Sequence, residues 1–355
     1  MGGARAGFDV KCAVELDERA MSAHRLNFPK STHVKKDIAS ITGKSLLASA
    51  GIAPGTLQGL VGGPPCQGFS AMGKNVTDDP RNALLSHFCR LIGEVNPAFF
   101  VFENVPGILR DRNRQFLDRA INTIPKHYTL LSPLTINAGD CGAATSRVRI
   151  FFLGFDPNRV RNITEEDFAP PEALATVRVK HALAGLPRIR STWATEDSSW
   201  RATEKLAGSE FNERISGRIP PEVGDSESIR RYSEKNLVSG CLGTIHAQET
   251  IERFSRLKSG EVDPISKARR LDAEGLCPTL RAGTGPERGS FQAVRPIHPR
   301  SPRVISPREA ARLQGFPDWF QFDHTKWHAF RQIGNSVSPI VAEFVLEKLR
   351  SALAD

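Results

Sequence analysis

The sequence lacks the features that mark membrane, exported or metal-binding proteins. No hydrophobic run approaches the roughly 20 residues of a membrane-spanning helix, and the start lacks the basic and apolar regions of a signal peptide. The six cysteines form no CxxC pair and no zinc-ligand spacing. There is also no internal repeat or low-complexity tract. We therefore expect a soluble, cytoplasmic protein without structural disulfides and without a metal site.

The composition is that of an ordinary globular protein. The chain has 355 residues, of which 39% are hydrophobic and 25% charged, enough for one large or two modest domains. Its formal net charge of +9 favours a polyanionic partner, although basicity has many other causes. The surplus is spread along the chain, so charge alone indicates no binding face.

The first 157 residues alternate between two kinds of segment. Short β-branched or aromatic runs, expected as strands, are FDVKCAVEL, HVKKDI, LQGLVGG, AFFVFEN, YTLLSPLTIN and VRIFFLGF. Stretches with helical spacing lie between them: DERAMSAHRLNF, GKSLLASAG, NALLSHFCRLIGEV and RQFLDRAINTI. This alternation predicts a doubly wound α/β domain built on a mainly parallel sheet.

The pattern changes after this domain. Residues 158–300 are rich in Pro, Gly, Ser and scattered charges and are too long for one loop, so we expect a second, smaller and irregular domain. Regular segments return in residues 301–355, where Ser306 and Glu309 form a capping-box pattern and a final amphipathic helix follows. We expect this last segment to rejoin the first domain.

The stretch LVGGPPCQGFS places Cys66 just after an expected strand. In a doubly wound sheet, ligands bind beyond the carboxyl ends of the strands. Gly62 and Gly63 allow close backbone approach, whereas Pro64 and Pro65 stiffen the turn. A lone cysteine is most often a buried small hydrophobe. The glycines and prolines before Cys66 instead favour a thiol presented at the rim of the sheet.

The stretch FFVFENVPG places a carboxyl group at the same rim. Four apolar residues run into Glu103 at an expected strand end. Partial removal from water would raise the pKa of this carboxyl group and let it donate a proton near neutral pH. The plainer alternative is an ordinary acid at the start of a helix.

Five motifs give the chain a resemblance to a known family. GGPPCQGFS, ENVPGI, TSRVRIFFLG, SPREAARLQGFPD and RQIGNSVSP resemble, in order and spacing, those of DNA (cytosine-5) methyltransferases. The resemblance implies a Rossmann-like methyltransferase fold, with a catalytic and cofactor-binding domain over residues 1–157 and a target-recognition domain over 158–300. It implies S-adenosyl-L-methionine (SAM) as cofactor and duplex DNA as partner of a monomeric enzyme. Nothing in the sequence shows whether a companion restriction endonuclease exists.

The resemblance also implies methylation at carbon 5 of a cytosine flipped out of the duplex. Cys66 would add to carbon 6 as a thiolate, because carbon 5 is a poor nucleophile until then. Glu103 would protonate or hydrogen-bond ring N3, Arg149 would contact the cytosine oxygen, and Arg147 would hold the catalytic loop. The plainer alternative for the two arginines is a solvated strand edge. Thr145 stands where the family has Gln, which puts the hydrogen bonds of that amide in question.

A cofactor site is implied at the carboxyl ends of the first strands. Glu15 follows the first expected strand, where an acid commonly binds ribose hydroxyls. Asp37 follows the next, where the family contacts the adenine amino group. The other positions that match the family's cofactor pocket are Pro65, Leu84, Asn335, Ser336 and Val337, and Ser70 matches a contact to the DNA backbone.

The start of the chain departs from the family. The opening DLFxGxGG is absent, and Glu15 follows Gly3 by only 12 residues, whereas the acid normally follows the glycine turn by about 20. We therefore expect that the central strand of the sheet is missing, together with the loop facing the methionine half of SAM.

Four hypotheses remain open. The first is an active DNA cytosine-5 methyltransferase that is a piece of a longer gene product. The second is an N-terminally truncated, catalytically silent DNA-binding remnant. Retention of Cys66, Glu103, Arg147 and Arg149 favours the first. A transfer-RNA methylase is less favoured because the middle segment is long enough to read duplex sequence, and a thiol hydrolase least, because no His has a motif context near Cys66.

Overall fold

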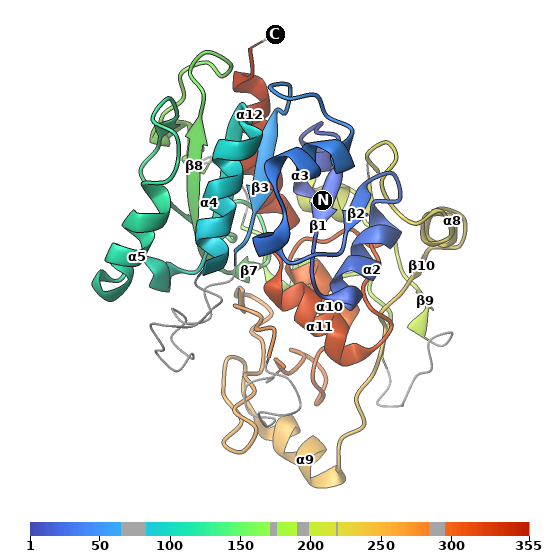
Figure 1. Ribbon diagram of the computed structural model, residues 1–355. Coiled ribbons are helices and arrows are strands. Elements are labelled where there is room, and N and C mark those ends of the chain that lie inside the picture. The colour runs from blue at the N-terminus through green and yellow to red at the C-terminus, as the bar shows by residue number, and fades with distance from the viewer. Residues whose placement is uncertain (65–82, 171–175, 190–198, 218, 284–294, 355) are drawn as a thin grey trace.

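The computed structural model describes residues 1–64, 83–170, 176–189, 199–217, 219–283 and 295–354. Its strands alternate with helices through the first half of the chain (Figure 1). The strands are β1 (Cys12–Val14), β2 (Thr32–Val34), β3 (Gly59–Gly62), β4 (Phe99–Asn104), β5 (Thr129–Leu130), β6 (Leu134–Asn137), β7 (Thr145–Ser146), β8 (Val148–Phe155), β9 (Arg201–Ala202), β10 (Leu237–Val238) and β11 (Cys277–Pro278).

Helices follow most of the expected segments. The α-helices are α1 (Gly2–Arg5), α2 (Glu18–Asn27), α3 (Gly43–Ala50), α4 (Ala83–Val95), α5 (Asp111–Ile121), α6 (Val179–Leu183), α7 (Glu210–Ser216), α8 (Ser226–Lys235), α9 (Gln248–Arg256), α10 (Pro307–Leu313), α11 (Lys326–Asn335) and α12 (Pro339–Ala352). Short 3-10 helices are η1 (Ile38–Ser40), η4 (Pro106–Leu109) and η5 (Glu165–Phe168). The capping box expected at Ser306 and Glu309 is confirmed at the start of α10. No helix within the described ranges is long and apolar enough to cross a membrane.

The main sheet combines parallel and antiparallel pairs. β3 and β4 are parallel, β8 runs antiparallel to β4, and β5 and β6 pair along the other edge of β8. The expected strand YTLLSPLTIN forms β5 and β6 separately, because Pro133 between them has no amide hydrogen to donate to a ladder. The α/β class is confirmed, with a mixed sheet.

β1 and β2 form a separate parallel pair. Figure 1 shows β1 beside β3, and side chains of both strands pack into one hydrophobic cluster with α3. Among the described residues, no strand pairs with the free edge of β1 or of β3. Val61 on β3 is 56% exposed. The expected absence of a central strand remains a prediction. The place of that strand would be between the free edges of β1 and β3.

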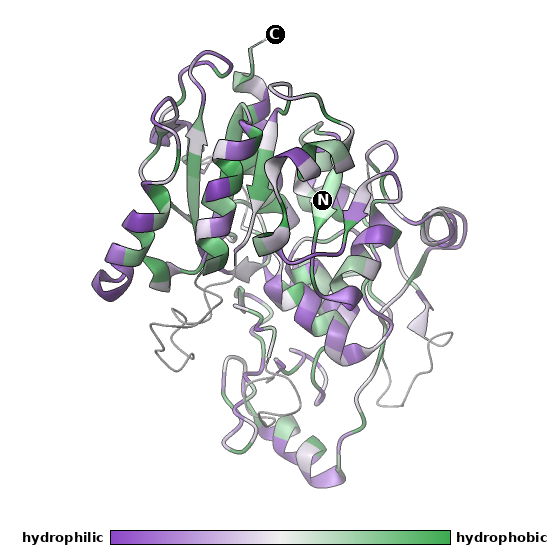
Figure 2. Ribbon diagram, viewed as in Figure 1, coloured by the Kyte–Doolittle hydropathy of each residue, from purple (hydrophilic) through white to green (hydrophobic). Residues whose placement is uncertain are grey.

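Helices cover both faces of the main sheet. Phe100, Phe102 and Phe152 pack under α4 and α5 on one face. Phe99 and Leu153 on the opposite face belong to the large cluster that includes α1 and α12. Figure 2 shows β3 and β8 as mainly hydrophobic, whereas α8 at the periphery is mainly hydrophilic. The alternating side chains of β4 and β8 thus supply both layers of the core.

The middle segment, residues 158–300, contributes side chains to two hydrophobic cores. Phe168, Val179 and Tyr232 belong to the large cluster that also contains residues of α10 and α12. A separate small cluster contains Phe254 of α9, Ala268 and Ile297, in the part that projects away from the sheet in Figure 1. The division into residues 1–157, 158–300 and 301–355 stays a prediction about function. In the packing of hydrophobic side chains, the part that forms a separate cluster is the region around α9.

Candidate active site

An acid and an arginine meet at the end of the main sheet. Glu103 lies on β4 and Arg149 on the adjacent antiparallel strand β8, with Arg149 Nε 2.6 Å from Glu103 Oε1. Their side chains are only 15% and 13% exposed. Burial raises the pKa of Glu103, although the charges of Arg149 and Arg147 act to lower it. This carboxyl group therefore keeps a proton to a higher pH than a solvated glutamate does.

The turn that leads to Cys66 begins beside this pair. A methyl group on Gly63 would lie 3.7 Å from Glu103 Oε2, and Asn104 Nδ2 donates to the carbonyl of Pro64 at 3.2 Å. Gly62 is needed here because a Cβ would lie 2.4 Å from the Phe88 ring of α4. The end of β3 therefore adjoins the end of β4. Cys66, Pro65 and Ser70 themselves lie outside the described residues.

The cysteines that the structure describes are poor nucleophiles. Burial raises the pKa of Cys89 and Cys241 to about 12 and that of Cys141 to about 11. It also raises the pKa of Cys12 and of the fully buried Cys277. None of these five thiols is in a setting that favours the reactive thiolate.

Arg147 has partners that the sequence did not indicate. It was expected to hold the catalytic loop. Its buried guanidinium donates from Nη1 to the carbonyl of Leu280 at 3.1 Å and from Nη2 to that of Gly334 at 2.8 Å. Burial lowers its pKa to about 9, with Arg149 adding to that effect. Thr145 Oγ1, at the position where the resemblance leads us to expect Gln, donates to the carbonyl of Cys277 at 3.0 Å.

Two exposed acids follow the paired parallel strands β1 and β2. Glu15 accepts from the amides of Leu16 and Asp17 at 2.8 and 2.9 Å, and Asp37 caps η1 by accepting from Ala39. Since the carboxyl ends of parallel strands meet at one edge, both carboxylates lie at the same rim. Leu16 was not singled out from the sequence, yet its side chain is 61% exposed. The sequence signal that could have identified Leu16 is its position, as an apolar residue directly after Glu15.

The C-terminal segment adjoins this rim. Gln332 Nε2 of α11 donates to the carbonyl of Arg19 at 3.0 Å, and Arg331 Nη1 lies 3.4 Å from Asp17 Oδ2. Asn335, the exposed last residue of α11, is therefore on the segment that packs beside the turn after β1. Val337 is partly buried between α11 and α12, with Ser336 before it, and Leu84 is partly buried in the first turn of α4.

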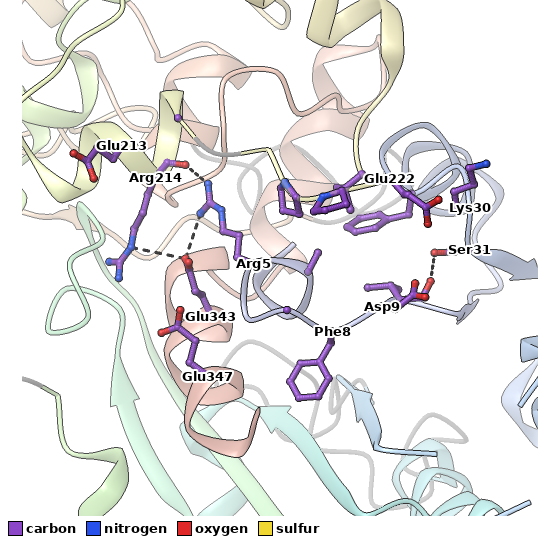
Figure 3. A pocket seen from close by; sticks show the side chains of 18 of the residues that line it. Arg5, Phe8, Asp9, Lys30, Ser31, Glu213, Arg214, Glu222, Glu343 and Glu347 are labelled. Atoms are coloured by element: carbon purple, nitrogen blue, oxygen red, sulfur yellow. Dashed lines mark hydrogen bonds and ion pairs between the residues drawn. The ribbon is translucent and has the colours of Figure 1, made fainter. Parts of the chain in front are cut away.

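A cavity of about 740 Å³ lies elsewhere (Figure 3). It is lined by residues of α7 and α12 and by residues that precede β1 and β2, so it adjoins the opposite edge from Glu15. Glu343 on its wall lies 3.5 Å from Arg5 Nη1 and 3.8 Å from Arg214 Nε. These ion pairs tie α1, α7 and α12 together. In the described ranges, no three His, Cys, Asp or Glu side chains could hold a metal ion.

Comparison with known proteins agrees with this arrangement. The family model for C-5 cytosine-specific DNA methylases matches residues 1–351. Type II methyltransferase M.XorII of Xanthomonas oryzae pv. oryzae is 38% identical over 99% of this chain and 82% of its own. Type II methyltransferase M.DdeI of Desulfomicrobium norvegicum is 28% identical over 97% and 84%.

Solved structures show the same fold. An E. coli crystal structure, described as a candidate DNA modification methyltransferase encoded within a prophage, is 46% identical. It superposes with a TM-score of 0.88 over 99% of this chain and 94% of its own. The Dnmt2 methyltransferase of S. pombe, 16% identical, gives 0.61 over 98% and 94%. These matches confirm the Rossmann-like methyltransferase fold, and with the family model they show that the chain belongs to the SAM-dependent C-5 cytosine-specific DNA methylases.

Proposed function

We propose that this protein transfers a methyl group from SAM to carbon 5 of a flipped cytosine in duplex DNA, through a covalent adduct with Cys66. The observation that carries the proposal is the buried pair of Glu103 and Arg149 beside the turn at Gly63 and Pro64. Cys66 is two residues beyond Pro64, and two residues span at most about 7 Å. The length of chain between Pro64 and Cys66 therefore allows the attack that we propose.

Each group has a chemical role in this proposal. The Cys66 thiolate forms a bond to carbon 6 while Glu103 gives its proton to ring N3, which makes carbon 5 nucleophilic. Carbon 5 then takes the methyl group that SAM supplies. Water takes the proton from carbon 5, the electrons of that C–H bond re-form the double bond between carbons 5 and 6 and expel the Cys66 thiolate, and the N3 proton returns to Glu103. Arg149 holds the Glu103 carboxylate and is placed to donate to the cytosine oxygen.

The rim around β1 and β2 has the groups that SAM requires. In this proposal Glu15 would bind the ribose hydroxyls, Asp37 the adenine amino group and Leu16 an apolar face of the adenine, which the exposure of these three side chains at one rim supports. Asn335 and Val337 would close the site from α11, together with Leu84 and Pro65. These residues fit the cofactor because exposed acids and an apolar side chain lie together at one rim.

The alternative is a DNA-binding remnant without catalysis. The free edges of β1 and β3 favour it, because the loop that would face the methionine half of SAM belongs between them. The retained Glu103–Arg149 pair favours the active enzyme. Under both hypotheses DNA is the partner, in keeping with the net charge of +9.

Bisulfite sequencing tests the proposal directly. Plasmid DNA from cells that express the protein, with an upstream DLFxGxGG-like strand and turn added, should contain 5-methylcytosine in one short sequence context. DNA from cells that express Cys66→Ala should contain none. Unmodified DNA from wild-type cells, with the protein folded and DNA-bound, would favour the remnant.

A further inference from the structure

The middle segment returns to the sheet at residues 277–282. This stretch lies alongside residues 144–147 and is hydrogen-bonded to them. We call this contact the return seam. It combines the parallel pairing of β7 with β11 and these hydrogen bonds: Cys277 N to Ala144 O (2.9 Å), Thr145 Oγ1 to Cys277 O (3.0 Å), Thr279 Oγ1 to Ser146 O (2.8 Å) and Arg147 Nη1 to Leu280 O (3.1 Å). The middle segment is therefore attached directly to the chain that enters β8.

The far side of the seam is closed by α11. A Cβ on Gly334 would lie 2.5 Å from Ala282 N and 2.6 Å from the carbonyl carbon of Arg281, closer than real Cβ atoms approach backbone. Arg147 Nη2 also donates to the Gly334 carbonyl. Arg147, directly before β8, thus hydrogen-bonds to the carbonyls of both Leu280 and Gly334.

The seam ends two residues before Arg149, which pairs with Glu103. A displacement of residues 277–282 must therefore shift the backbone that carries Arg149, because Thr145 and Arg147 are fully buried and have no room to adjust independently. The seam is a hydrogen-bonded route between the segment expected to read DNA and the strand that carries Arg149.

We propose that Thr145 is a positioning residue whose hydroxyl fixes the target-recognition segment against the strand that carries Arg149, so that the segment holds target DNA in register with the Glu103–Arg149 pair. The inference rests on the proposed function. Thr145 occupies a position at which the family has Gln, and here the hydroxyl makes the bond to Cys277. A merely structural contact would instead stabilise the fold without affecting which cytosines are methylated.

Four variants distinguish a positioning role of Thr145 from a merely structural one. Thr145→Val keeps the shape of the side chain but removes the donor, whereas Thr145→Ser keeps the hydroxyl. Gly334→Ala disturbs the seam from the opposite side. Thr203→Val is the control outside the seam, because Thr203 is also buried and donates to the carbonyl of Gly185, although its hydroxyl additionally accepts from Arg312 Nη2 at 3.2 Å.

Hydrogen exchange measures the seam without requiring activity. Thr145→Val should speed amide exchange in residues 277–282 by about two- to tenfold, the loss expected for one hydrogen bond. Thr145→Ser and Thr203→Val should leave these amides unchanged. Unchanged exchange in Thr145→Val would overturn the inference while leaving the proposed function intact.

Bisulfite sequencing of plasmid DNA treated with each variant measures the positioning role. Thr145→Val and Gly334→Ala should lower the ratio of target to off-target methylation by about threefold or more, and Thr145→Ser should restore the ratio. An equal loss at all cytosines, or a lower melting temperature alone, contradicts positioning. If the wild-type protein methylates no DNA, the proposed function fails and the positioning role with it, whatever the exchange result.

Discussion

Arg149 Nε lies 2.6 Å from Glu103 Oε1 across two antiparallel strands, and both side chains are largely shielded from water. The arginine holds the carboxyl group in place, while burial favours its protonated form. The pair thus combines fixed geometry with a carboxyl group whose pKa is raised above that of a solvated glutamate.

Glu103→Gln should lower methyl transfer by about 10²- to 10⁴-fold while DNA binding remains, because an amide can hydrogen-bond N3 but cannot supply a proton. The raised pKa of Glu103 means that wild-type activity is present below that pKa and lost as pH rises through it. Steady-state rates across pH check both points. Glu94→Gln, which alters an Arg90-paired acid on α4, is the control and should keep the wild-type profile.

SAM binding by residues 1–355 should be weak. The loop that would face the methionine half of SAM belongs between the free edges of β1 and β3, and among the described residues no strand pairs with either edge. Adding an upstream DLFxGxGG-like strand and turn should restore binding. Calorimetric titration compares the two versions, and tight binding by the shorter one would show that the missing-strand prediction is wrong.

Target choice should follow the middle segment. Exchanging residues 158–300 for those of a relative should transfer the methylated sequence, and exchanging only 246–304, around the separate small core, should suffice. Non-specific affinity should fall steeply with salt in both chimeras, since phosphate contacts supply it. Bisulfite sequencing reads the outcome, and a target that stays with residues 1–157 contradicts the domain assignment.

The protein should lose stability in acid through His24. Its Nδ1 lies 2.9 Å from His33 Nε2 and its ring stacks on Phe28, and burial, with the His33 charge second, lowers the pKa of His24 from 6.5 to about 4. The unfolded state therefore binds more protons between these values, and stability falls as pH falls from 6.5 to 4 by on the order of 1–3 kcal/mol.

Denaturant unfolding of His24→Gln checks this prediction. The variant should show a smaller loss of unfolding free energy between pH 7 and pH 5 than the wild type. His127→Gln, at an exposed site, should behave as the wild type does. An unchanged pH dependence in His24→Gln would mean that other groups cause the acid sensitivity.

Local patterns predicted much of the fold. The periodicity of residues 17–28 and 43–51 led to α2 and α3, and the apolar run before Glu103 led to β4. The pairing of Glu103 with Arg149 depends on the antiparallel register of β4 and β8, which no local sequence pattern contains. The contacts of Arg147 with residues 280 and 334 span more than 130 positions, so they could be found only in the structure.

Covalent trapping tests the central claim most directly. A duplex with 5-fluorocytosine at the methylated position should trap the protein in the presence of SAM, because fluorine cannot leave carbon 5 as a proton does. The experiment uses residues 1–355 and the version with the added upstream strand. The account predicts a covalent complex with Cys66 present, at least in the extended version, and none with Cys66→Ala. A complex that persists in Cys66→Ala, or no complex with either wild-type version, would contradict it.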